Sequence, residues 1–207
     1  MDDRRTFLIE MYNQMFSDIN RHITVIWQSV GVVVGAFAIF SLVEKNVISI
    51  DIATSIIVIL CFWLFAHMLD AGYWYNRNLA IISNTERQFL EISDLKNIQY
   101  YFGMHRSKNN KMITHLRVQA ALGWGILVLV ILYHFVERIL PGIKAAHAEI
   151  DPVRGLPYLF LVAGLAYGGW LWRDRDASYS NFVTNSPGIE IDTSSVEYGT
   201  GHTTDPK

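Results

Sequence analysis

Four long apolar stretches dominate this sequence of 207 residues, and they constrain its fold more than any other feature. Because an α-helix rises about 1.5 Å per residue, roughly 20 apolar residues cross a hydrocarbon core about 30 Å thick. The pattern predicts an all-α, polytopic integral membrane protein with four transmembrane helices. The fourth stretch is the shortest, so it either spans with interfacial aromatic anchors or forms a re-entrant or tilted segment. The stretches cover residues 23–43, 52–72, 118–136 and 156–172.

The segments that flank these stretches define the expected organisation of the chain. Near the N-terminus, Leu8, Met11, Met15 and Ile19 recur at helical spacing, which predicts an amphipathic helix on the membrane surface or packed under the bundle. The loop between the first two stretches is short, so their helices form an antiparallel hairpin. We expect an amphipathic N-terminal helix (1–22), a transmembrane hairpin (23–72), a cytoplasmic helical hairpin (73–117), a second transmembrane hairpin (118–173) and a flexible cytoplasmic tail (174–207).

The middle segment, residues 73–117, is the largest polar element between the stretches. It contains no proline and no glycine before Gly103, so the second transmembrane helix should continue without a break to about Asn97. A polar, basic turn follows, and a shorter helix from about Lys111 leads back to the membrane. Beyond Asp174 the sequence is rich in Ser, Thr, Gly, Asn and Asp, which predicts a disordered or loosely attached tail.

The basic residues indicate how the chain is oriented. Most of the 17 Lys and Arg residues lie before the first stretch, between the second and third, and after the fourth. The other connecting segments hold only Lys45, Arg138, Lys144 and Arg154. By the positive-inside rule, both termini should be cytoplasmic, with the protein in the inner (plasma) membrane. The first residues lack a continuous apolar region and a small-residue cleavage site, so no cleavable signal peptide is expected.

Composition and motifs argue against several classes of function. The formal net charge of −2 offers no basic surplus for nucleic acid as a partner. The one cysteine, Cys61, excludes a disulfide framework within the chain and a Cys-rich metal site. The sequence carries no phosphate-binding loop, dinucleotide fingerprint, zinc-protease motif or nucleophile motif. We therefore expect a non-enzymatic protein without a cofactor or metal.

Polar side chains share one helical face at the end of the second stretch. His67, Asp70, Trp74, Arg77 and Ile81 are three or four positions apart, so they align if the helix is continuous. Counted from the start of the stretch, His67 lies roughly 22 Å and Asp70 roughly 27 Å along the helix axis. Asp70 and Arg77 then lie near the water boundary. His67 lies deeper, where a polar group is costly unless it has a partner.

Two interpretations of this face stay open. His67 and Asp70 would form a proton or ion relay, or a pH-sensitive gate with Arg77. Alternatively, His67 hydrogen-bonds to a polar group across the bundle, and Gln28 and Gln119 lie at a similar depth. In that case Arg77 is a cytoplasmic anchor of the positive-inside kind.

Small residues recur within the apolar stretches. Gly31 and Gly35 form a GxxxG pair in the first stretch, and Gly164 and Gly168 form another in the fourth. Such spacing lets two helix backbones approach closely. The glycine faces either pack helices within one chain or bring copies of the chain together.

Two further groups of titratable residues lie in or next to the segments that connect the apolar stretches. The basic turn that contains His105 is most simply a patch that faces anionic lipid headgroups. From the end of the third stretch onward, a histidine–carboxylate group matches no known zinc spacing, so a solvated loop is the expected interpretation. This group comprises His134, Glu137, His147, Glu149 and Asp151.

The layout of residues 1–100 resembles the small SLATT-type membrane effectors of bacterial defence systems. The resemblance rests on the N-terminal helix, the tight first hairpin and the run-on segment YWYNRNLAIISNTERQFLEI. The second hairpin, 118–172, departs from that layout, and no site residue can be carried over. The resemblance implies an oligomeric effector in antiviral defence that forms a pore or perturbs the bilayer when a cytoplasmic sensor signals.

The leading hypothesis is therefore a non-enzymatic, self-associating membrane protein that opens a pore or disrupts the lipid bilayer. Two alternatives stay open beside it. The first is an accessory or scaffold subunit that docks a cytoplasmic protein through residues 78–115 or through the tail. The second is a small ion-coupled or proton-coupled transporter that uses His67 and Asp70.

Overall fold

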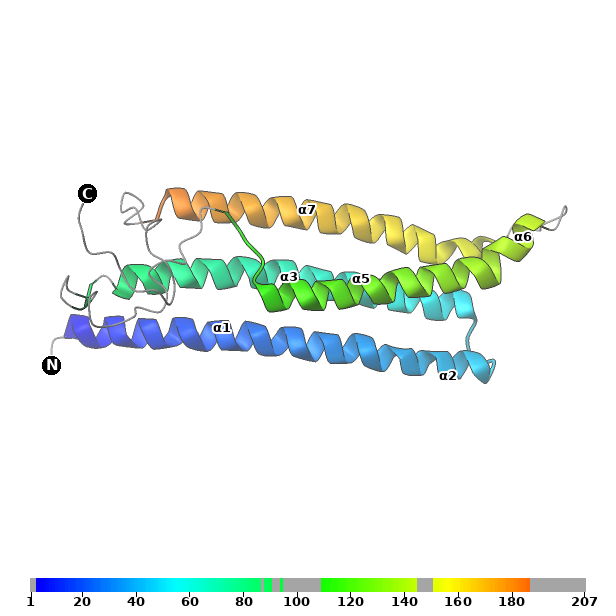
Figure 1. Cartoon of the computed structure of the whole chain (residues 1–207), viewed down its shortest axis with the longest axis horizontal. Coiled ribbons are helices and arrows are strands. Elements are labelled where there is room, and N and C mark those ends of the chain that lie inside the picture. The colour runs from blue at the N-terminus through cyan, green and yellow to red at the C-terminus, as the bar shows by residue number, and fades with distance from the viewer. Residues whose placement is uncertain (1–2, 87, 91–93, 95–108, 145–150, 187–207) are drawn as a thin grey trace. The chain divides into compact units, whose positions relative to one another are not determined.

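The computed structural model describes residues 3–86, 88–90, 94, 109–144 and 151–186 (Figure 1). The ordered elements within these residues are all helices. Four of them are long and apolar enough to cross a membrane, so the predicted all-α fold with four candidate spans is confirmed at that level. The turn around His105, the loop with His147 and Glu149, and the tail after residue 186 lie outside the described residues.

The first helix, α1 (Asp3–Gly35), joins the predicted N-terminal helix to the first transmembrane helix in one element. The helix is not interrupted at the boundary expected near residue 22, because the first glycine is Gly31 and no proline occurs before Pro141. A 3₁₀ turn, η1 (Ala36–Ala38), and the short helix α2 (Ile39–Glu44) follow. Asn46 then adopts a positive φ of 57°, a conformation that asparagine tolerates well.

The second long helix, α3 (Ile50–Glu86), confirms that the helix continues through His67, Asp70 and Arg77. It ends at Glu86, earlier than the predicted end near Asn97, and a turn follows at residues 88–90. The residues just before this end are weak helix formers. The Thr85 hydroxyl donates to the Ile81 carbonyl at 3.0 Å, a bond that often bends the last turn of a helix.

The third and fourth candidate spans are α5 (Thr114–His134) and α7 (Leu156–Thr184). A π-helical turn, η2 (Phe135–Ile139), and α6 (Leu140–Lys144) extend α5, and a 3₁₀ turn, η3 (Pro152–Gly155), precedes α7. Pro157 lies in the first turn of α7 as predicted.

The prediction of a flexible tail from residue 174 was wrong for its first part, because α7 continues to Thr184. Tyr179 is 0% exposed and Val183 is 7% exposed. These two side chains are four positions apart, so they lie on one face of the helix and bury it together. A short apolar stripe therefore orders a segment whose average composition is polar.

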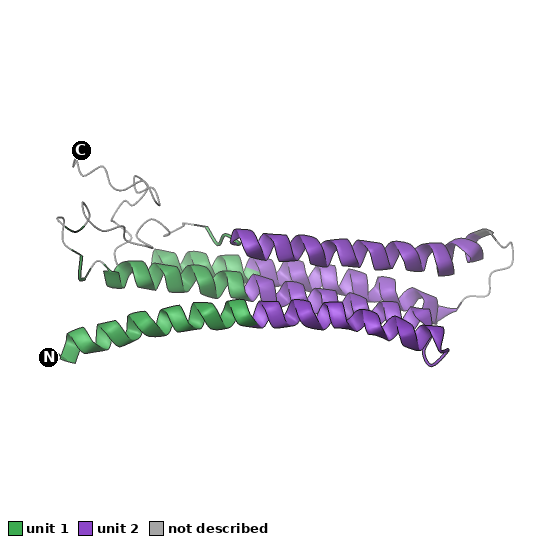
Figure 2. Cartoon of the chain, turned by 60° about the horizontal axis from the view of Figure 1, so that its bottom comes forward, with its two compact units in different colours: residues 1–24, 71–112, 174–207 green, residues 25–70, 113–173 purple. Residues whose placement is uncertain are grey.

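The chain divides into two compact units, which Figure 2 colours separately. Unit 1 comprises residues 1–24, 71–112 and 174–207, and unit 2 comprises residues 25–70 and 113–173. In unit 1, α1 packs on the last part of α3 through its predicted apolar stripe. The core of that contact is Ile19, Leu79 and Ile82, with Tyr12, Met15, Phe16, Ile23 and Tyr75 packed around it.

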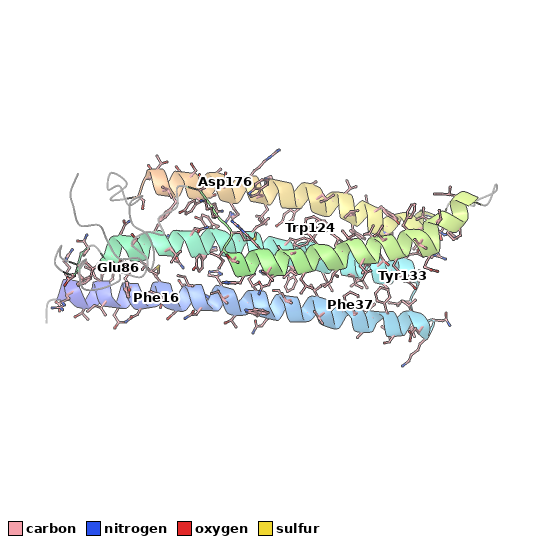
Figure 3. The ribbon with its side chains drawn as sticks, in the orientation of Figure 1. Phe16, Phe37, Glu86, Trp124, Tyr133 and Asp176 are labelled. Carbon is pink, nitrogen blue, oxygen red and sulfur yellow. The ribbon has the colours of Figure 1, made fainter. Side chains whose placement is uncertain are left out.

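In unit 2, α3 supplies the central core. Its side chains Ile57 and Leu64 are 0% and 2% exposed. Phe62, Phe65 and Trp124 form a ring cluster between α3 and α5 (Trp124 is labelled in Figure 3). The Phe65 and Trp124 rings stack with centroids 4.6 Å apart. These rings therefore link α3 to α5, with Phe65 buried and Trp124 43% exposed.

Candidate functional site

An acid, a histidine, an arginine and a tyrosine meet in unit 2, and we call these four residues the Asp51 cluster. Arg138 Nε and Nη2 donate to Oδ1 and Oδ2 of Asp51 at 3.0 and 2.8 Å. The Nε2 atom of His134 lies 2.9 Å from Asp51 Oδ1, and its Nδ1 atom lies 3.1 Å from the hydroxyl of Tyr158. The cluster therefore joins α3, the α5–η2 segment and α7.

Local structure explains why these side chains converge. Asp51 lies in the first turn of α3, where the helix dipole favours a carboxylate. Ser49 caps this turn, since its Oγ accepts from the Ile52 N–H at 3.3 Å. His134 and Arg138 are four positions apart, so they project from the same side of their helical segment. The π-helical turn η2 begins directly after His134, and such turns often occur at functional sites.

The Asp51 cluster is buried and its charges are balanced. The side chain of His134 is 0% exposed, that of Asp51 is 2% exposed, and that of Arg138 is 32% exposed. The geometry suits a neutral histidine whose Nε2–H donates to Asp51 while Nδ1 accepts from the Tyr158 hydroxyl. One carboxylate and one guanidinium then cancel, as a buried ion pair requires.

This arrangement connects three helical segments. Tyr158, His134 and Asp51 are linked in that order by hydrogen bonds. Within the described part of the chain, no group of three or more His, Cys, Asp or Glu side chains could hold a metal ion.

In the described part of the chain, His67 and Arg77 of the polar face that the sequence singled out on α3 contact aromatic rings. The ring of His67 meets the ring of Trp63, one turn away on the same helix, with centroids 4.6 Å apart. His67 and Asp70 are both half-buried. Arg77 stacks on the rings of Trp74 and Phe182, at 5.0 and 5.3 Å from their centroids. In unit 1 it thus connects α3 to the last turns of α7.

The two glutamines proposed as partners of His67 do not play that role. Gln28 is exposed on α1. Gln119 is 4% exposed on α5, yet neither its Nε2 nor its Oε1 has a hydrogen-bond partner among the described residues. The predicted bond between His67 and Gln119 is therefore not formed. A buried amide without a partner typically costs about 1–3 kcal/mol.

The four GxxxG glycines differ in what surrounds them. A Cβ added at Gly164 would collide with the ring of Phe62, so this glycine allows α7 to approach α3. A Cβ at Gly31, Gly35 or Gly168 would meet nothing within 4 Å. Gly123, which belongs to neither motif, is a packing glycine, because its Cβ would lie 2.8 Å from Cε1 of Phe65. Packing within the chain thus accounts for Gly164 alone among the four.

Unit 1 contains a second contact that the sequence did not predict. The guanidinium of Arg175 lies over the ring of Tyr73, 5.1 Å from its centroid, and pairs with Asp174 at 2.7 Å. Together with the Arg77–Phe182 contact, this fixes the extension of α7 against α3. In the same unit, the rings of His22 and Trp74 stack with centroids 6.1 Å apart. The Tyr12 hydroxyl donates to Glu86 of α3 (Figure 3 labels Glu86 and Phe16).

Sequence reasoning missed the Asp51 cluster and misjudged His134, which was expected in a solvated loop and is fully buried. The sequence nevertheless contains a signal for this cluster. Asp51 directly precedes one apolar stretch, and the His134–Arg138 pair closes another. In antiparallel helices these two ends coincide, so an acid and two basic side chains converge. Comparisons with protein families, curated proteins and solved structures gave no match to this chain.

Proposed function

We propose that this protein is a non-enzymatic, self-associating membrane protein whose copies meet along the face of α1 that carries Gly31 and Gly35. The observation that supports this most directly is the open space around these glycines. A Cβ at either position would meet nothing within 4 Å, whereas the equivalent motif residue Gly164 lies against Phe62. The first pair is thus free for a contact outside the chain.

The physical argument concerns the cost of glycine in a helix. In a helix interior glycine is about 1 kcal/mol less favourable than alanine, and a face that meets only lipid gains nothing from it. Two glycines four positions apart let a second helix backbone approach closely, which offsets that cost through van der Waals packing. Trp27, Val32 and Val34 around the pair are 59%, 47% and 53% exposed, so the same stretch of α1 also offers large apolar side chains.

Bulky substitutions at the two glycines, studied in a lipid bilayer, test the proposed association. Gly31→Leu and Gly35→Leu should each reduce the number of subunits per assembly, counted by photobleaching of single assemblies in nanodiscs or vesicles. Gly125→Leu is the matched control, because Gly125 also lies in an apolar helix with nothing within 4 Å of its Cβ. An unchanged subunit count in both α1 variants would refute the proposed face.

We also propose that the assembled copies form a pore or disrupt the bilayer, as expected of a membrane effector. The conducting path of such a pore would lie between copies of the chain, in line with the proposed association. Wild-type protein in liposomes should release a small fluorescent dye or dissipate an ion gradient, and Gly31→Leu should reduce this in step with assembly. Assembly without leakage, together with a stable co-purifying cytoplasmic protein, would favour the scaffold alternative.

The transporter alternative has less support from the geometry. His67 contacts a ring of its own helix, and the α3 segment between Asp51 and His67 buries apolar side chains such as Ile57 and Leu64. A proton-coupled carrier needs a polar or hydrated route between such groups. Flux that depends on pH and is lost in His67→Ala would restore this alternative.

The proposed orientation places both termini in the cytoplasm of a cell whose plasma membrane holds the four spans. It is supported by the distribution of Lys and Arg residues along the chain. Val47 lies in the turn between α2 and α3 and is 66% exposed. A membrane-impermeant maleimide should label Val47→Cys in intact cells, and should label Ser180→Cys only after permeabilisation. The reverse labelling pattern would show the opposite orientation and contradict the proposal.

A further inference from the structure

We propose that Arg77 binds the phosphate group of an anionic membrane lipid, at a site that α3 and α7 form within unit 1. The site comprises Arg77 and the rings of Trp74 and Phe182, and we call these three residues the Arg77 site. The inference rests on the proposed insertion of the four apolar helices into a membrane. It is independent of the proposed association through α1.

Aromatic rings hold the guanidinium of Arg77 in place. Its Cζ atom lies over the rings of Trp74 and Phe182, at 5.0 and 5.3 Å from their centroids. Trp74 in turn stacks on the ring of His22 from α1, with centroids 6.1 Å and planes 7° apart. Ring faces attract a cation, but they do not bond its N–H groups as an oxygen acceptor does. The contacts therefore fix the position of a positive charge that can still bind an oxygen ligand.

The charge of Arg77 is not balanced by an acid of the chain. Among the described residues, no carboxylate pairs with Arg77, although the side chain is half-buried. The acids of unit 1 have other partners, since Asp174 pairs with Arg175 at 2.7 Å and Glu86 accepts from the Tyr12 hydroxyl at 3.2 Å. A cation that is partly removed from water gains from a bound counter-ion. An anion from outside the chain would supply it.

The level of Arg77 along α3 corresponds to the lipid headgroups. Counted from Ile52, where the apolar stretch begins, Arg77 lies about 37 Å along the helix axis. The hydrocarbon core is about 30 Å thick, and about 40–45 Å with the headgroup regions, so Arg77 lies in the layer that contains the phosphates. Counted in the same way from Leu156, Phe182 lies about 39 Å along α7, at a matching level. Trp74 is of the residue type that is enriched in this layer.

A phosphodiester is the anion that suits this geometry. A guanidinium presents its N–H groups in a planar fork that matches two phosphate oxygens, and stacking on rings keeps that fork oriented. The phosphodiester of an anionic lipid such as phosphatidylglycerol carries one negative charge, which balances the charge of Arg77. A zwitterionic lipid such as phosphatidylcholine also brings an ammonium group, so the positive charge of the site stays unbalanced. We therefore expect a preference for the anionic lipid.

Native mass spectrometry of the full chain in detergent tests this preference. Phosphatidylglycerol and phosphatidylcholine are titrated separately, and the dissociation constant of the first bound lipid is compared. The wild type should bind phosphatidylglycerol about tenfold more tightly, and Arg77→Gln should lose most of that difference. Arg77→Lys keeps the charge without the planar fork, so its preference should be intermediate.

Arg175→Gln is the matched control. The guanidinium of Arg175 also lies over a ring, 5.1 Å from the centroid of Tyr73, but it already pairs with Asp174. Its loss should leave the lipid preference unchanged. Phe182→Leu removes one ring of the site and should weaken phosphatidylglycerol binding several-fold, which keeps the test informative if Arg77→Gln does not fold.

Inorganic phosphate distinguishes a lipid ligand from a soluble one. Millimolar phosphate should displace little phosphatidylglycerol, because the acyl chains hold the lipid at the site. Displacement by phosphate, equal affinities of the wild type for the two lipids, or the same loss in Arg77→Gln and Arg175→Gln would overturn the proposal. Reconstitution into nanodiscs separates this inference from the proposed function. Protein that does not enter the bilayer would refute both, whereas inserted protein without a lipid preference would refute the Arg77 site alone.

Discussion

The Nε2 atom of His134 lies 2.9 Å from Oδ1 of Asp51, although 83 positions separate the two residues along the chain. Arg138 completes the contact through two hydrogen bonds to the same carboxylate. A fold that brings an acid and two basic side chains together at the ends of apolar helices should be sensitive to the loss of any one of them.

Replacing the acid alone should be strongly destabilising. Asp51→Leu leaves the partly exposed guanidinium of Arg138 and the buried imidazole N–H of His134 without their acceptor, and breaking one side of a buried ion pair typically costs about 3 kcal/mol. The free energy of unfolding, measured by detergent denaturation in bicelles, should fall by about that amount. The double variant Asp51→Leu/Arg138→Leu should lose less than the sum of the single variants. Asp151→Asn, from an ion pair that is about one-third exposed, serves as the control and should change stability little.

The two glycines of the α7 motif should respond in opposite directions. Gly164→Ala should lower the thermal midpoint, because the new Cβ collides with the Phe62 ring. Gly168→Ala meets nothing within 4 Å and should be neutral or stabilising by up to about 1 kcal/mol, the helix propensity of alanine over glycine. Adding Phe62→Leu should rescue Gly164→Ala in part. Equal effects of the two alanine substitutions would contradict the packing described for α7.

Replacing Gln119 with an apolar side chain of similar shape should stabilise the protein. Both of its amide atoms are buried without a partner among the described residues, so Gln119→Met removes an unmet desolvation cost. Detergent denaturation should show a gain of about 1 kcal/mol. Gln28→Met, at an exposed position, controls for a general increase in hydrophobicity. A loss of stability specific to Gln119→Met would mean that the amide binds a group outside the described residues.

The extension of α7 should depend on Tyr179. Tyr179→Ala removes a fully buried ring, a change that costs about 3 kcal/mol or more for large aromatic side chains. Hydrogen–deuterium exchange should then show lost protection at residues 174–184. Ser180→Ala, at an exposed neighbouring position, should leave the protection unchanged. If both variants exchange alike, burial of Tyr179 is not what orders this segment.

Hydropathy alone predicted four long apolar helices, because a run of roughly 20 apolar residues has few other structural solutions. The continuity of α3 through Arg77 followed equally from the absence of helix breakers. The ends of the helices were less predictable from the sequence. The end of α3 at Glu86 depends on weak helix formers and a tertiary bond from Tyr12, and the order of residues 174–184 depends on two side chains in a polar background.

The candidate site was harder to foresee, since it depends on which helix ends meet. The depth of His67 could be counted along a single helix, so the sequence was enough to propose it as a candidate. Asp51 and His134 lie at the ends of separate apolar stretches, and their contact becomes evident only when α3 and α5 are paired. The glycines show the same limitation. Gly31 and Gly164 stand in identical motifs, and only their surroundings distinguish a packed glycine from an open one.

The hydrogen bond between His134 and Tyr158 also bears on how the chain is made. Tyr158 belongs to α7, which follows α5 along the chain, so Nδ1 of His134 has no contact with Tyr158 until α7 is synthesised. A buried polar group in that condition is costly in hydrocarbon. We therefore expect α5 and α7 to be inserted as a pair.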